Sequence, residues 1–289
     1  MDLIQFLQSA FSPALDRPMT LVTDLASERA YIVALAIVYW TVDAAVGLRL
    51  GVALMLSIAL NFGLKELFML PRPPAELVIP MAAETGTGYG LPSGHAQSTA
   101  TFWGILAMTW PSRALALVAA ALIVVVSVTR LYLGLHFPSD VLAGAALGLG
   151  VAWLAVRFGP RLRRPEVSRW ILTGVALALP AAALLVGGHL AAFPVVMGAV
   201  AGYLVTALWY RHQVWGRPIV RVAQAAFGLA LLFALLLGSS ALLPEAFKAN
   251  PFGSYTRYLA LTLVALIGVP WLNRRLMRGV VQEMPGRTP

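Results

Sequence analysis

Residues 113–140 read RALALVAAALIVVVSVTRLYLGLHFPSD, an apolar run bounded by two arginines and followed at once by a histidine and an aspartate. The run 113–131 is close to the roughly 20 residues that a helix needs to cross the hydrocarbon core of a bilayer. Arg130, His136 and Asp140 stand at its end. The stretch therefore predicts a membrane helix that carries polar, chemically active side chains to one face of the membrane.

The whole chain has the composition of a membrane protein. Of its 289 residues, 60% are hydrophobic and only 11% are charged, whereas soluble domains carry about 25% charged residues. The chain contains no cysteine, which excludes disulfides, thiolate nucleophiles and cysteine-ligated zinc. Its first residues lack the pattern of a cleavable signal peptide, so we expect none. The expected fold class is an all-α integral membrane protein built as a helical bundle.

Nine stretches are candidate membrane spans, each near the length of a crossing helix. The longest loop between them, 70–94, is rich in Pro and Gly, and a basic linker occupies 158–169. We expect an amphipathic segment in the membrane interface at 1–27, a catalytic core at 28–160, and C-terminal helices of unassigned role at 161–289, the first of which could complete the core. The candidate spans are 30–47, 51–69, 95–110, 113–131, 140–157, 170–188, 191–209, 219–240 and 255–272.

The basic residues predict the orientation, because cytoplasmic loops of membrane proteins are enriched in Lys and Arg. If Arg49 faces the cytoplasm, 14 of the 21 basic residues fall on that side, which also explains the formal charge of +9 without nucleic acid. We then expect a multi-pass protein of a bacterial-type inner membrane, with its N-terminus outside, its C-terminus inside and Lys65, Arg72 and Arg130 on the periplasmic side. The assigned cytoplasmic residues are Arg49, Arg113, Arg157, Arg161, Arg163, Arg164, Arg169, Arg211, Arg217, Arg221, Arg274, Arg275, Arg278 and Arg287.

A second polar cluster, Pro92-Ser93-Gly94-His95, immediately precedes another apolar run. Ser93 suits the N-cap of a helix, and Gly94 lets the backbone come close to a ligand. The exposed N–H groups of a helix start bind anions. His95 in the first turn would face such an anion.

Arg130, His136 and Asp140 form the third cluster. Pro138 fits the first position of a helix, which would put His136 just before that helix and Asp140 in its first turn. A carboxylate there can bond one imidazole nitrogen and leave the other free to attack, which is the orienting logic of the Ser-His-Asp triad. Asp140 could also be only a helix cap.

Lys65 and Arg72 form the remaining cluster. A lysine inside an apolar stretch is costly and marks a functional site by default, although it could also snorkel to the interface. Arg72, flanked by prolines, offers a planar fork for phosphate oxygens. The sequence has no dense cluster of carboxylates of the kind that binds magnesium. We therefore expect neither a metal nor another cofactor.

Taken together, K-x6-R-P, P-S-G-H and R-x5-H-x3-D resemble, in order and spacing, the three-part signature of the type 2 phosphatidic acid phosphatase family. That family includes bacterial lipid phosphate phosphatases, glucose-6-phosphatase and vanadium haloperoxidases. The resemblance covers about residues 60–145 by motif. Thr129 stands where the family usually has Ser, so the hydroxyl is kept.

This resemblance implies a role for each residue. His136 would attack phosphorus and form a phosphohistidine, Asp140 would orient it, and His95 would protonate the leaving oxygen and then activate water. The groups implied to bind the phosphoryl oxygens are Lys65, Arg72, Ser93, Gly94 and Arg130.

A site at the membrane boundary suits a lipid, so the expected substrate is undecaprenyl diphosphate or a phosphatidate-type lipid in the bilayer. Three alternatives stay open. The layout is similar to glucose-6-phosphatase, which favours a soluble ester, and a phosphohistidine could pass its phosphate to another lipid. A non-enzymatic lipid transporter is the third, because the helices of 161–289 carry no recognised motif. Those helices could also form a homodimer interface.

Overall fold

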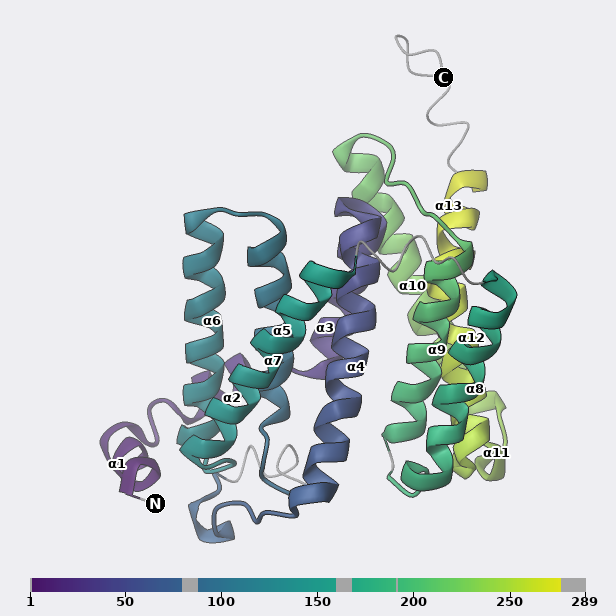
Figure 1. Ribbon diagram of the computed structural model, residues 1–289. Coiled ribbons are helices and arrows are strands. Elements are labelled where there is room, and N and C mark those ends of the chain that lie inside the picture. Colours follow the sequence, from purple (N-terminus) through teal and green to yellow (C-terminus); the bar gives the residue numbers. More distant parts are fainter. Residues whose placement is uncertain (1, 80–87, 160–167, 191, 277–289) are drawn as a thin grey trace. The chain divides into compact units, whose positions relative to one another are not determined.

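The computed structural model describes residues 2–79, 88–159, 168–190 and 192–276, and no β-strand occurs within those ranges. Figure 1 shows the order of the helices along the chain. The basic linker predicted at 158–169, with Arg161, Arg163 and Arg164, lies almost wholly outside the described residues, as do Arg278 and Arg287.

The chain divides into two compact units. Unit 1 consists of Met1–Ile32 and Ala53–Leu162, and unit 2 of Val33–Val52 and Arg163–Pro289. The long helix α4 (Ala44–Phe68) therefore begins in unit 2 and ends in unit 1. Every residue of the three polar clusters belongs to unit 1. Its other elements are α1 (Asp2–Phe11), α2 (Asp16–Leu25), the start of α3 (Glu28–Ile37), η2 (Ala75–Leu77), α5 (Gly94–Thr109), α6 (Arg113–Tyr132) and α7 (Pro138–Phe158).

Six helices among the described residues are long and apolar enough to cross a membrane. The apolar helices at Ala30–Val42 and Phe193–Trp209 are shorter, and α5 has only 16 residues. The predicted count of nine spans is therefore not confirmed. The six are Ala44–Phe68, Arg113–Tyr132, Pro138–Phe158, Arg169–Gly187, Pro218–Leu242 and Pro251–Leu276.

The break between the first two predicted spans was misplaced. The sequence suggested 47–51, but the first helix ends in the π-helical turn η1 (Val38–Val42) and α4 runs straight through that stretch. Asp43, in an extended conformation, separates them. Its Oδ1 accepts hydrogen bonds from the N–H groups of Ala45 at 2.8 Å and Val46 at 3.0 Å. A short carboxylate satisfies the free amides of a helix start, so the second helix begins there.

Two glycines of α7 set its packing against α5. A Cβ atom at Gly148 would lie 2.3 Å from the carbonyl oxygen of Gln97, and one at Gly144 would lie 2.5 Å from that of Ser93. The two glycines are four residues apart, the spacing that lets helices in a membrane approach closely. The start of α5, with Gly94 and His95, is thereby held against the start of α7.

The turn between α6 and α7 depends on Gly134. Its φ of 71° is in the left-handed region that glycine adopts without strain, and a Cβ there would lie 1.9 Å from the carbonyl oxygen of Leu77. The N–H of Ile79 donates to the carbonyl of Leu133 at 3.2 Å. The chain after Arg72 therefore packs directly on the turn that carries His136.

Unit 2 is centred on two π-helical turns, η1 and η5 (Val264–Gly268). The hydroxyl of Tyr39 donates to the carbonyl of Leu266, and Nε1 of Trp40 donates to that of Ala265, both at 2.9 Å. A π turn leaves main-chain carbonyls out of the regular α ladder, and these two side chains satisfy them. The other helices of the unit are α8 (Arg169–Gly187), α9 (Phe193–Trp209), α10 (Pro218–Leu242), α11 (Glu245–Ala249), α12 (Pro251–Leu263) and α13 (Val269–Leu276).

Candidate active site

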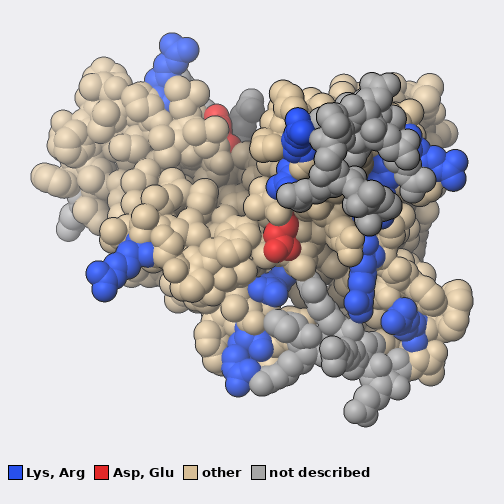
Figure 2. All heavy atoms as spheres, turned by 90° about the horizontal axis from the view of Figure 1, so that it is seen from above, with Lys and Arg blue, Asp and Glu red and all other residues tan. Residues whose placement is uncertain are grey.

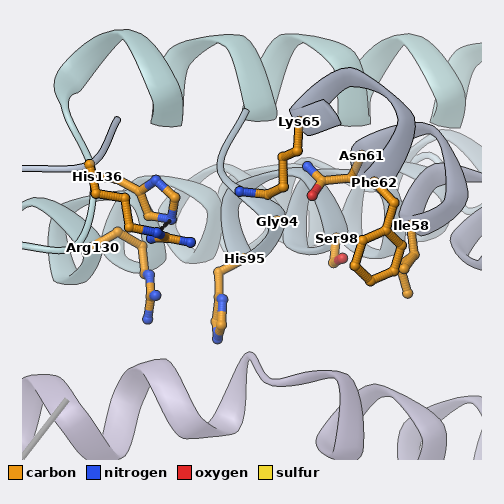
Figure 3. A pocket seen from close by; sticks show the side chains of 10 residues that line it. Ile58, Asn61, Phe62, Lys65, Gly94, His95, Ser98, Arg130 and His136 are labelled. Atoms are coloured by element: carbon orange, nitrogen blue, oxygen red, sulfur yellow. Dashed lines mark hydrogen bonds between the residues drawn. The ribbon is translucent and has the colours of Figure 1, made fainter. Parts of the chain in front are cut away.

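Unit 1 contains a cavity of about 150 Å³ between α4, α5 and the ends of the loops that carry Arg72 and His136 (Figure 3). Six of the eight residues singled out from the sequence line it. Asp140 lies behind His136, and Ser93 lies behind Gly94. The lining residues are Ile58, Asn61, Phe62, Lys65, Arg72, Gly94, His95, Ser98, Arg130 and His136.

His136 is held at both ring nitrogens. Nδ1 lies 3.3 Å from Oδ2 of Asp140, and Nε2 lies 3.0 Å from Nη1 of Arg72. A guanidinium has no acceptor, so Nε2 must carry the lone pair and Nδ1 the proton that it shares with Asp140. The nitrogen that faces the cavity is therefore the nucleophilic one.

The environment of His136 favours its neutral form. Only 1% of the residue is exposed, and this burial lowers the pKa of the imidazole, with further lowering from the charges of Arg72, Arg130 and Lys65. The hydrogen bond to Asp140 acts in the opposite direction. A neutral imidazole keeps the lone pair that a nucleophile needs.

Local sequence explains the pair His136 and Asp140. Helix α7 begins at Pro138, as predicted, and Asp140 lies in its first turn. Its Oδ2 also accepts a hydrogen bond from the N–H of Phe137 at 2.9 Å. The carboxylate of Asp140 is thus a helix cap and also the hydrogen-bond partner of His136.

Arg72 and Lys65 are fixed by main-chain carbonyls. Arg72 donates to the carbonyls of Leu135 at 2.7 Å and Gly88 at 2.9 Å. Lys65 donates to the carbonyl of Tyr89 and, at 3.4 Å, to that of Gly90. These bonds orient the two cations before a ligand arrives.

Arg130, at the end of α6, is completely buried. Its Nη1 donates to Oγ1 of Thr23 in α2 at 2.9 Å. The amino-terminal helices therefore contribute to the site, although the sequence patterns assigned them no part in it. Burying an arginine is costly unless its N–H groups find partners or an anion, and the cavity that it lines supplies a place for an anion.

The start of α5 forms the opposite wall. Gly94 and His95 line the cavity, and the side chain of His95 lies between those of Arg130 and Ser98 in Figure 3. Ser93 occupies the N-cap position, but its hydroxyl makes no capping bond. That hydroxyl is buried with no hydrogen-bond partner among the described residues. The prediction that Ser93 is the N-cap residue is confirmed, although its side chain makes no capping bond, and a phosphate contact from it stays a prediction.

Four lining residues were missed from the sequence: Ile58, Asn61, Phe62 and Ser98. The first three precede Lys65 by seven, four and three residues, which places them on the same face of α4. Ser98 follows His95 by three residues on α5. Helical spacing from the two predicted residues could therefore have found all four.

No three His, Cys, Asp or Glu side chains gather as a potential metal site in the described part of the chain. The groups that line the cavity are instead cationic or hydrogen-bond donors, together with an oriented imidazole. Such a set suits an anion with several oxygens. Helices long and apolar enough to cross a membrane end at this set, as expected of an integral membrane protein.

Comparison with known families agrees with that class. The model of the PAP2 superfamily matches residues 46–164, and that of the transmembrane extension of PAP2 superfamily phosphatases matches residues 190–280. The chain therefore belongs to the PAP2 superfamily and is a multi-pass integral membrane protein. The first match contains the whole candidate site except for the contact from Thr23.

Individual relatives match parts of the chain. The chain is 37% identical over 83 residues to lipid A 4'-phosphatase of Bacteroides thetaiotaomicron, covering 29% of this chain and 37% of that protein. It is 33% identical over 116 residues to undecaprenyl-diphosphatase of Sulfolobus acidocaldarius, and this match covers 38% of this chain and 55% of that protein. These alignments thus span between about a third and about half of each relative.

A solved structure, a transmembrane PAP2-type phosphatidylglycerolphosphate phosphatase from Bacillus subtilis, is similar to this chain with a TM-score of 0.46 and 25% identity. The similarity covers 56% of this chain and 85% of that structure.

Proposed function

We propose that this protein is a membrane phosphatase that hydrolyses a lipid phosphate through a phosphohistidine on His136. One observation carries the proposal: Nε2 of His136, the unprotonated nitrogen that accepts from Arg72, lies in a cavity walled by three cations while Nδ1 is bonded to Asp140. The named relatives include phosphatases of lipids with different headgroups. The family and the site chemistry therefore point to the same reaction class.

In the first step, Nε2 of His136 attacks phosphorus while the bond between phosphorus and the ester oxygen breaks. Burial and the neighbouring cations lower the pKa of His95, and the negative charge of a bound phosphate raises it again. His95 is then protonated in the complex and gives a proton to the leaving oxygen, which departs as an alcohol. The imidazole becomes positively charged, and Asp140 stabilises it through Nδ1. Arg72 keeps its charge and turns its N–H groups to the phosphoryl oxygens.

In the second step, the now neutral His95 takes a proton from water as the water oxygen attacks phosphorus. The phosphorus–nitrogen bond breaks and inorganic phosphate leaves. Lys65, Arg72 and Arg130 neutralise the charge that spreads over the phosphoryl oxygens in both transition states. The amide groups at Gly94 add donors from the start of α5.

For the membrane orientation, we propose a periplasmic site in an inner membrane, with the N-terminus outside and the C-terminus inside. In unit 1, Arg113 and Arg157 lie near the ends of α6 and α7 that are opposite the site. Figure 2 looks from above Figure 1, where α6 begins, and more Lys and Arg than Asp and Glu are visible in that view. This charge bias supports a cytoplasmic location for that end.

The segment 1–27 is proposed to lie in the membrane interface beside the site. Its helices α1 and α2 expose Phe6 and Leu25, while Gln8 donates to the carbonyls of Leu77 at 2.6 Å and Tyr132 at 2.8 Å. An exposed apolar face on a short helix suits the boundary between headgroups and acyl chains. A homodimer through the helices of 161–289 stays a prediction.

The function is tested by phosphate release from the purified protein in detergent. The panel contains undecaprenyl diphosphate, phosphatidate, phosphatidylglycerophosphate and glucose 6-phosphate. We expect release from at least one lipid and none from glucose 6-phosphate. His136→Ala should be inactive, while His189→Ala, which removes an exposed histidine of unit 2, should keep full activity.

The competing functions give different results. Hydrolysis of glucose 6-phosphate alone would mean a soluble-ester phosphatase. Phosphate transfer to an added lipid alcohol without release to water would mean a phosphotransferase. Full activity of His136→Ala would exclude the phosphohistidine, and a protein that binds lipid without any turnover would be a transporter.

A further inference from the structure

The cavity has two chemically different ends, and Figure 3 separates them. His136 and Arg130 lie at one end, with Arg72 bonded to His136. Asn61, Ser98, Ile58 and Phe62 lie at the other, and His95 is located between the two groups. If His95 protonates the leaving oxygen, the leaving group lies at the end formed by these four residues, which we call the leaving-group end.

The amide of Asn61 has a fixed orientation. Its Nδ2 donates to the carbonyl of Pro92 at 3.1 Å and to Oε1 of Gln97 at 2.8 Å. Gln97 is itself fixed, because its Nε2 donates to the carbonyl of Ser57 at 2.8 Å. Carbonyl oxygens only accept, so neither amide can be flipped without losing these bonds.

This orientation leaves the cavity with an acceptor. Both N–H groups of Asn61 are committed, and its Oδ1 lies 3.4 Å from the position of a Cβ on Gly94, another cavity residue. An amide oxygen accepts a hydrogen bond from an alcohol or water, but it has no proton to offer a phosphate oxygen. Facing an anionic group, it is repulsive.

The rest of the leaving-group end is neutral. Ile58 and Phe62 are apolar, and Ser98 carries only a hydroxyl. The closest cation is Lys65, which directs two of its N–H groups to the carbonyls of Tyr89 and Gly90. A second phosphate at this end would be desolvated with no cation of its own among the described lining residues, because Lys65 has one N–H group left and that group is assigned to the reacting phosphoryl group, and such burial is costly.

We propose that the enzyme cleaves lipid phosphomonoesters in preference to lipid diphosphates, because its leaving-group end takes a neutral alcohol and disfavours a phosphate. In a monoester the leaving group is an alcohol with an apolar tail, which matches Ile58 and Phe62. In a diphosphate the leaving group is a phosphate, which meets Oδ1 of Asn61. This inference rests on the proposed function and narrows its substrate class, since relatives of both kinds are known.

The test compares two substrates with the same tail, farnesyl phosphate and farnesyl diphosphate, in the same detergent. Initial rates are measured with separation of farnesol from farnesyl phosphate, so that the first cleavage of each substrate is counted. We expect kcat/KM for the monophosphate to exceed that for the diphosphate by at least about tenfold, the effect of one charged hydrogen bond or more.

A charge placed at the leaving-group end should change this preference. Phe62→Lys supplies a cation for the second phosphate, so the ratio of diphosphate to monophosphate kcat/KM should rise about tenfold. Leu67→Lys adds the same charge on α4 at an exposed position outside the cavity and should leave the ratio unchanged.

The outcomes separate the inference from the function on which it rests. Wild-type protein that cleaves the diphosphate as well as or better than the monophosphate would overturn the inference while leaving a lipid phosphatase. Cleavage of neither lipid, with release from glucose 6-phosphate, would overturn the proposed function instead. Should Phe62→Lys not fold, the wild-type ratio decides alone.

Discussion

The two compact units bury polar groups of different kinds. Unit 1 buries Arg130, His136 and Asp140, which are 0%, 1% and 3% exposed. The buried polar residues in the described part of unit 2 are uncharged, namely Thr206, Gln224 and Asn273. Burying an ionisable group costs far more than burying an amide or hydroxyl. The buried ionisable groups of unit 1 lie at or next to the cavity, which indicates that unit 1 carries the chemistry.

Hydrogen bonds in the two units follow the same division. In unit 1 one group of them converges on side chains that face the cavity, as with Asp140 on His136. In unit 2 they join one helical segment to another, as Tyr39 and Trp40 join η1 to η5. Removing a bond in unit 1 should therefore affect turnover, while removing one in unit 2 should affect stability.

The largest effect is expected for Asp140→Asn. The amide can still cap α7, but it no longer stabilises the charged imidazole or fixes its tautomer, so kcat should fall by about 10³–10⁴-fold. Phosphate release in detergent measures this. Leu142→Ala, on the same helix at an exposed position outside the cavity, is the control and should stay within about threefold of wild type. Near-normal kcat for Asp140→Asn would reduce Asp140 to a helix cap.

An intermediate effect is expected for Gly148→Ala. The added Cβ would lie 2.3 Å from the carbonyl oxygen of Gln97, so α5 and α7 must separate at a cost of about 1–3 kcal/mol. The separation would also displace His95 from His136, and both the melting temperature and kcat should fall. Gly150→Ala, with no atom within 4 Å of the new Cβ, should not lower either. The same melting temperature and kcat in both variants would contradict the close packing of α5 against α7 at Gly148.

The smallest effect is expected for Tyr39→Phe in unit 2. It removes one hydrogen bond to the carbonyl of Leu266, which is worth about 1 kcal/mol, so the melting temperature should fall by a few degrees. Turnover at a temperature where the protein is folded should not change. Tyr210→Phe, whose hydroxyl bonds to none of the described residues, serves as the matched control. A loss of kcat in Tyr39→Phe would contradict the view that this hydrogen bond of unit 2 affects stability and not turnover.

The sequence predicted the site where local geometry controls it. The step of four residues from His136 to Asp140, with Pro138 between them, is enough to define a helix start with a carboxylate beside the imidazole. Lys65, Arg72, Gly94, His95 and Arg130 were likewise identified from spacing and from the cost of charge in an apolar chain. The helices were also clear, but the number of spans was not, because α5 and the helices at Ala30–Val42 and Phe193–Trp209 are too short to be assigned as spans by length.

Other features were beyond local patterns. The interruption of the helix at Asp43 was missed. A carboxylate inside an apolar stretch suggests a buried residue in the middle of a span, and only its hydrogen bonds to Ala45 and Val46 identify it as the start of a helix. Thr23 gave no signal, since its bond to Arg130 joins residues 107 positions apart. Asn61 is read as one more polar residue of α4 until Gln97 and Pro92 fix its amide.

The amino-acid sequence by itself determined that this is a helical membrane protein and which side chains could act on a phosphate, because apolar length and short-range spacing act through a single helix or turn. Only the tertiary structure decided which atoms face the cavity. The lone pair of His136 is set by Arg72 from another loop, and the acceptor at the leaving-group end is set by Gln97 from another helix. Such contacts depend on packing between distant segments, including the close approach of α5 and α7 at two glycines. The spacing of these glycines is a local pattern, but it does not specify which helix they face.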